Sequence, residues 1–103
     1  MDETSQIQPP PSFVDIYAGR AGRLTISKPE LVARYELCED LANHLTEQAQ
    51  LIYHGGNASE EGVLRTMHDA LCTEGSVVQP AEARWIVLRL AELLNWRAPG
   101  LAA

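Results

Sequence analysis

The feature that most constrains the fold is a stretch from Pro29 to His54 in which apolar side chains recur with helical spacing. They return at alternating intervals of four and three residues: Leu31, Tyr35, Cys38, Ala42, Leu45, Ala49 and Ile52. This spacing places one apolar stripe along an α-helix, and Leu37 and Leu41 widen it to the face that a globular helix buries. We therefore expect a long amphipathic helix over residues 29–54, with Leu31, Cys38, Leu45 and Ile52 facing inward.

Both ends of this helix carry sequence signals. Ser27 and Glu30 have the spacing of a capping box, in which each side chain satisfies a free backbone N–H near the helix start. Pro29 suits the first turn, because the donor that proline lacks would have no partner there. Gly55 and Gly56 follow the helix and predict a left-handed stop.

Two further helices are expected, over residues 59–74 and 80–96. Ser59 caps the first of them, and Gly75 ends it. Pro80 and Glu82 open the second in the same way as the first-turn proline and glutamate of the long helix. The segment 80–96 is apolar over most of its circumference, so it either lies centrally in the domain or turns part of its surface toward a partner.

The N-terminal region lacks a helical pattern. Residues 1–12 are polar and end in three prolines and a serine, which predicts a disordered tail. Residues 13–26 combine a short apolar patch with a glycine-rich loop and are expected to form an extended arm. The resulting prediction is an all-α, three-helix bundle over residues 27–97, with an extended and partly disordered N-terminal arm and a C-terminal tail over 98–103.

The chain's length and composition exclude several classes of protein. A chain of 103 residues suits a single domain. It has no apolar run near the ~20 residues that span a bilayer, and its acidic start resembles no targeting peptide, so we expect no membrane and a cytoplasmic protein. Cys38 and Cys72 do not form a Cys-x-x-Cys pair, which favours two small buried thiols.

A formal net charge of −6 argues against nucleic-acid binding, because such domains usually present a basic face. The alternative remains a small helix-turn-helix DNA-binding regulator built from segments 59–74 and 80–96. Its recognition helix would present Arg84, Arg89 and Arg97. The apolar character of that helix weighs against this alternative.

No pattern predicts catalysis, a cofactor or a metal. Asp40, His44 and Glu47 share one face of the long helix, but a helical metal site needs matching ligands from a second helix. The segment 59–74 offers only His68 and Asp69. The glycines and arginines of residues 19–23 lack the Gly-Lys-Ser/Thr of a phosphate loop. We therefore expect a protein that is not an enzyme, with no catalytic, cofactor-binding or metal-binding residues.

The remaining candidates are residues for protein–protein interaction. Aromatic side chains are frequent at interfaces, and the outer side of the long helix is acidic. The candidate residues are Phe13, Tyr17, Glu36, Asp40, Glu47, Trp85 and Trp96. They predict a small adaptor or regulator that binds a protein partner, with a homodimer as one form of that interaction.

Several segments resemble a family of short proteobacterial proteins that often carry the label "ATPase with chaperone activity". The resemblance rests on residues 10–13, 33–42, 45–47, 81–85 and 89–96. It implies an association with a larger ATPase or chaperone system. The chain's own lack of a nucleotide-binding motif argues that it does not itself hydrolyse ATP.

Overall fold

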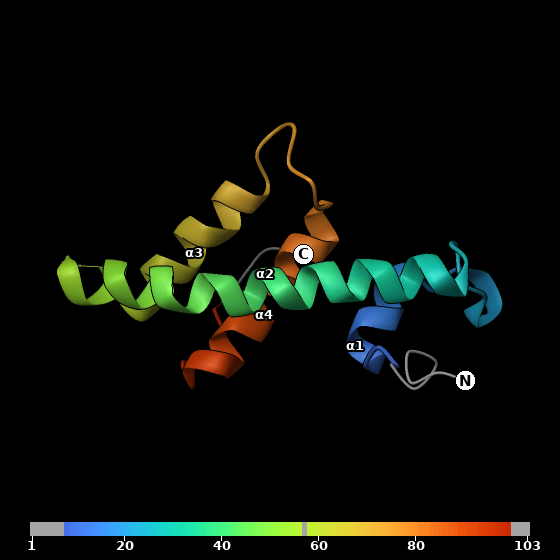
Figure 1. Ribbon diagram of the computed structural model, residues 1–103, viewed down its shortest axis with the longest axis horizontal. Helices are drawn as coiled ribbons and strands as arrows, with labels where there is room; N and C mark the ends of the chain where they lie inside the picture. Colours follow the sequence, from blue (N-terminus) through green and yellow to red (C-terminus); the bar gives the residue numbers. More distant parts are fainter. Residues whose placement is uncertain (1–7, 57, 100–103) are drawn as a thin grey trace. The chain divides into compact units, whose positions relative to one another are not determined.

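The computed structural model describes residues 8–56 and 58–99 (Figure 1). The chain divides into two compact units, the N-terminal unit Met1–Leu37 and the C-terminal unit Cys38–Ala103. Four α-helices occur in the described part: α1 (Pro11–Val14), α2 (Lys28–Gly55), α3 (Glu60–Leu71) and α4 (Pro80–Leu94). The described ranges contain no β-strand, only a single bridge between Ala18 and Leu24, so the all-α prediction is confirmed.

The N-terminal unit corrects the predicted extended arm and the count of three helices. Residues 11–22 form the short helix α1 and two 3₁₀ turns, Asp15–Tyr17 and Arg20–Gly22. Pro11 opens α1, where its fixed φ favours helix, and the amides of Phe13 and Val14 both donate to the carbonyl of Pro10. Residues 1–7 of the expected tail lie outside the described residues, as do residues 100–103 at the other end.

Aromatic packing gives this turn-rich segment an interior. The ring of Phe13 is fully buried, 6.0 Å from the ring of Tyr17 and 5.6 Å from that of Tyr35. Phe13 comes from α1, Tyr17 from the following turn and Tyr35 from α2, so three stretches of sequence meet at one cluster. Burying large rings in offset or edge contacts stabilises a segment too short to be helical alone.

The expected start of α2 is confirmed, and its end is corrected. The amide of Glu30 donates to Ser27 Oγ, and the amide of Ser27 donates to Glu30 Oε1, both over 3.2 Å. This is the predicted capping box. The helix continues to Gly55, but neither Gly55 nor Gly56 has its φ in the left-handed region, so the expected left-handed stop is wrong.

α3 and α4 belong to the C-terminal unit and are joined by the loop of residues 72–79 (Figure 1). α3 begins at its predicted cap but ends at Leu71, three residues before the expected end, and Gly75 adopts φ +86° in the loop. α4 ends at Leu94 because Asn95 adopts the left-handed conformation. The amide of Trp96 then bonds the carbonyl of Ala91, which is the backbone pattern of a Schellman motif.

The hydrophobic core of the C-terminal unit joins all three of its helices. Seven residues form the buried cluster: Ala49 from α2, Val63, Leu64 and Met67 from α3, and Val87, Leu90 and Ala91 from α4. α4 supplies further buried residues, among them Trp85 and Ile86, so most of its apolar surface lies in the interior. On α2, Leu31 and Cys38 are buried and Leu45 is partly buried, whereas Ile52 is 37% exposed and was wrongly expected to face inward.

The cap of α3 yields a first testable prediction. Ser59 Oγ accepts the amide of Gly62 over 3.0 Å, so replacing Ser59 by alanine removes the partner of a helix-end donor. We expect Ser59→Ala to lower the free energy of unfolding by about 1 kcal/mol, measured by urea denaturation. Ser59→Asp should retain most of the stability, because aspartate also caps. Thr66→Ala, an exposed change in the middle of α3, is the control. Equal losses of unfolding free energy in Ser59→Ala and Thr66→Ala would contradict the capping role of Ser59.

Candidate interaction surface

The outer side of α2 within the C-terminal unit carries a continuous exposed stripe. Asp40, His44, Glu47 and Leu51 follow one another at intervals of four, three and four residues, and all four are exposed. On an α-helix this spacing keeps side chains on one face. We call these four residues the outer stripe. Leu51 is 68% exposed, which makes it one of the most exposed large apolar side chains in the described residues.

The imidazole of the outer stripe is held by its own helix. His44 Nδ1 lies 2.9 Å from the carbonyl oxygen of Asp40, one turn earlier. No group of three or more histidine, cysteine or acidic side chains gathers into a metal-binding arrangement within residues 8–56 and 58–99. The outer stripe therefore presents two carboxylates, an imidazole tied to backbone and an apolar end.

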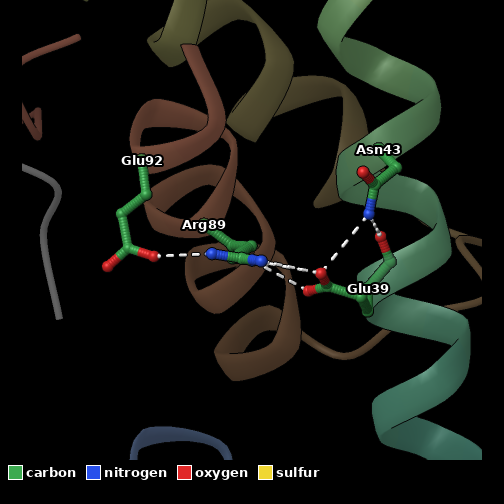
Figure 2. Close-up of polar contacts among 4 residues, drawn as sticks. All are labelled: Glu39, Asn43, Arg89 and Glu92. Carbon is green, nitrogen blue, oxygen red and sulfur yellow. Dashed lines mark hydrogen bonds and ion pairs between the residues drawn. The ribbon is translucent and has the colours of Figure 1, made fainter. Parts of the chain in front are cut away.

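One structural contact on α2 was not expected from the sequence. Glu39 lies next to Asp40 in the sequence but forms a partly buried ion pair with Arg89 of α4 (Figure 2). Arg89 Nε donates to Glu39 Oε1 over 2.9 Å, and Arg89 Nη2 donates to Glu39 Oε2 over 2.9 Å. Two parallel bonds of this kind fix both side chains, because the guanidinium fork matches the carboxylate.

Two further side chains complete this network, as Figure 2 shows. Asn43 Nδ2 donates to the carbonyl oxygen of Glu39 over 2.8 Å, and Arg89 Nη1 donates to Glu92 Oε1 over 3.1 Å. Hydrogen bonds from Arg89 lower the pKa of the Glu39 carboxyl below its ordinary value of 4.5 and outweigh the opposite effect of burial. The same bonds to Glu39 raise the pKa of Arg89, so the pair is charged at neutral pH.

The charge balance of the C-terminal unit is strongly acidic. Residues 38–103 contain nine acidic and four basic side chains. Two of the four arginines are engaged by carboxylates, Arg89 as described and Arg65 through Glu61 at 2.8 Å. Among the described residues, Asp40 and Glu47 have no cationic side chain within ion-pair distance. Their charge is therefore available to a partner.

The structure separates the sequence-predicted interaction residues into two groups. Glu36, Asp40 and Glu47 are exposed, with Glu36 in the N-terminal unit and the other two in the outer stripe. Phe13, Tyr17 and Trp85 are at most 8% exposed, so these rings belong to the interior and not to a surface. Trp96 is half-buried, with its ring centroid 5.1 Å from that of Tyr53.

The structure also shows where the two cysteines and the three arginines of the alternative DNA-binding helix lie. Cys38 is buried and Cys72 is exposed, which corrects the expectation that both are buried, and no disulfide joins them. Of the three arginines proposed for a DNA-reading helix, Arg89 is engaged by Glu39 and Glu92, and Arg97 lies beyond the end of α4. Only Arg84 remains exposed on α4 itself.

A cavity of about 460 Å³ lies in the C-terminal unit, at the end of α2 and the start of α3. Its lining includes Tyr53, Ser59, Glu60 and Glu61, together with Arg97 and Ala98 from the segment after α4. The cavity therefore combines an aromatic ring with side chains of both charge signs.

The chain was compared with protein-family models, with curated proteins and with solved structures, and no match was found in any of the three. No helix in the described part is both long and apolar enough to cross a membrane.

Proposed function

We propose that this protein is a small, non-enzymatic cytoplasmic adaptor or regulator, and that its outer stripe binds a basic protein surface. The observation that carries the proposal is the exposed stripe of Asp40, Glu47 and Leu51 on a unit with nine acidic and four basic side chains. Carboxylates on the same helix face as an exposed apolar side chain suit an interface in which charge guides the partner and apolar burial holds it.

The acidic charge favours a different protein over a second copy as the partner. In a symmetric dimer formed through the outer stripe, each stripe would face its own copy. Two surfaces of the same negative charge would then be brought together, which is unfavourable. A partner whose surface presents lysine or arginine beside an apolar patch satisfies both features of the stripe. The family resemblance suggests that this partner belongs to an ATPase or chaperone system.

The test is cross-linking and affinity capture from the native cells with a stripe variant and a charge-matched control. The stripe variant carries Asp40→Asn, Glu47→Gln and Leu51→Ala. The control removes two exposed carboxylates from another part of the unit, through Asp69→Asn and Glu74→Gln. We expect one basic partner to bind the unmodified protein and the control equally, and to bind the stripe variant about tenfold more weakly.

The dependence of partner binding on salt concentration gives a second measurement for the unmodified protein and the stripe variant. Binding through exposed charges should weaken as ionic strength rises, because the Debye length falls from about 10 Å at 0.1 M to about 3 Å at 1 M. A partner captured equally by the stripe variant and the unmodified protein would refute the proposed surface. A strictly monomeric protein that captures nothing above background would refute the proposed function.

A further inference from the structure

The cavity at the end of α2 is a candidate binding site distinct from the outer stripe. Tyr53 contributes its ring from the last turns of α2, Glu60 comes from the first turn of α3, and Arg97 comes from the segment that follows α4. Three separate segments of the C-terminal unit therefore meet around one space of about 460 Å³. This volume lies within the range of small-molecule sites, about 300 to 1,000 Å³.

One wall of the cavity is held in place by aromatic packing. The ring of Tyr53 lies against the ring of Trp96, with centroids 5.1 Å apart and planes inclined by 55°. Both side chains also pack against the hydrophobic core of the unit. The ring of Tyr53 also contacts the ring of His54, with centroids 5.2 Å apart and planes inclined by 69°, so two aromatic neighbours fix the orientation of this lining residue.

The cavity is lined by opposite charges that do not pair with each other. Glu61 is engaged by Arg65, whose Nη2 lies 2.8 Å from Glu61 Oε2. Within the described residues, no ion pair joins Arg97 to Glu60 or Glu61. Glu60 and Arg97 therefore line one space, and neither forms an ion pair with another described residue.

These charges select the chemical class of the ligand. A simple anion would be attracted by Arg97 and repelled by Glu60. A simple cation would be attracted by Glu60 and repelled by Arg97. A molecule with both charges satisfies both groups. We propose that the cavity binds a small zwitterion, such as a free α-amino acid, with its carboxylate on Arg97 and its ammonium on Glu60 beside the ring of Tyr53.

The experiment is an NMR titration of the full chain with representative amino acids and their singly charged derivatives. N-acetylation removes the ammonium, and methyl esterification removes the carboxylate. We expect saturable shifts of the Ser59, Glu60 and Ala98 amides with at least one amino acid. Each derivative should bind about tenfold more weakly, because it loses a hydrogen-bonded contact to a charged group. Amides of the core cluster should stay in place.

Two variants assign the charges, and two controls test whether the effect is local. Glu60→Gln should weaken binding of the amino acid but leave binding of its N-acetyl derivative unchanged. Arg97→Gln should weaken the amino acid but leave its methyl ester unchanged. Arg84→Gln and Glu74→Gln remove exposed charges that do not line the cavity, so they should change nothing. Absence of any saturable shift, tighter binding in Arg97→Gln, or equal binding of all derivatives would overturn the proposal.

Discussion

Replacing Leu90 with alanine should lower the free energy of unfolding by about 3 kcal/mol. Leu90 is completely buried in the cluster that joins α2, α3 and α4, so the change removes apolar contacts and leaves a cavity that neighbouring helices cannot fully fill. The loss is a large part of the 5–15 kcal/mol that stabilises an ordinary domain. Urea denaturation followed by circular dichroism would measure it.

Leu51→Ala is the matched control, because it removes the same atoms from a side chain that is 68% exposed. We expect its effect to stay within about 0.5 kcal/mol. Leu90→Met, which nearly conserves volume, should cost less than about 1.5 kcal/mol. If Leu90→Ala and Leu51→Ala destabilise the protein equally, the described core is wrong.

The second large effect is expected at the Glu39–Arg89 ion pair. Arg89→Met removes two parallel hydrogen bonds and leaves a partly desolvated carboxylate, which should lower the free energy of unfolding by about 2 kcal/mol at neutral pH. Solvent screens both partners, whose side chains are 23% and 34% exposed, so the pairwise coupling itself should be about 1 kcal/mol. A double-mutant cycle with Glu39→Gln measures that coupling.

The contribution of this pair should depend on pH in a defined direction. The pKa of Glu39 is lower in the folded state than its ordinary value of 4.5, so folding favours the ionised carboxyl. The resulting stability is fully present above the unfolded pKa and is lost as the pH falls through the lower folded pKa. The difference between the unmodified protein and Arg89→Met should therefore shrink below about pH 4.

The exposed Glu61–Arg65 pair provides the control for that experiment. Its side chains are 54% and 52% exposed, and the two residues lie one helical turn apart. Arg65→Met should cost no more than about 0.5 kcal/mol. A coupling between Glu39 and Arg89 no larger than this, or one that persists unchanged in acid, would contradict the structural role of this partly buried pair.

The sequence predicted those features that depend on neighbouring residues. The capping box of Ser27 and Glu30, the cap at Ser59 and the proline at the start of α4 each act within one helical turn. The end of α4 was predicted two residues too late, at residue 96, because asparagine adopts the left-handed conformation less often than glycine and Asn95 was therefore a weak stop signal.

Features that depend on distant residues could not be predicted in the same way. Glu39 and Arg89 are separated by 50 positions, and nothing in the local pattern distinguishes Glu39 from its exposed neighbour Asp40. α1 has only four residues, and its Phe13 packs against Tyr35, which a local pattern could not reveal. The same periodicity predicted that Ala49 and Ile52 are both buried. Ala49 is buried, but Ile52 is 37% exposed, because residue spacing alone does not show which turns of a helix are covered by other elements.

The small side chains on the inner face of α2 have a mechanical consequence. Ala42 and Ala49 are completely buried, and Ala49 lies in the core cluster. A displacement of α2 by one residue, with a rise of about 1.5 Å and a rotation of about 100°, would bring Asn43 and Gln50, which are larger and polar, into the buried positions of Ala42 and Ala49. Close-packed interiors do not accommodate such a change. In the C-terminal unit, the buried alanines therefore fix the position of α2 against the helices that pack on it.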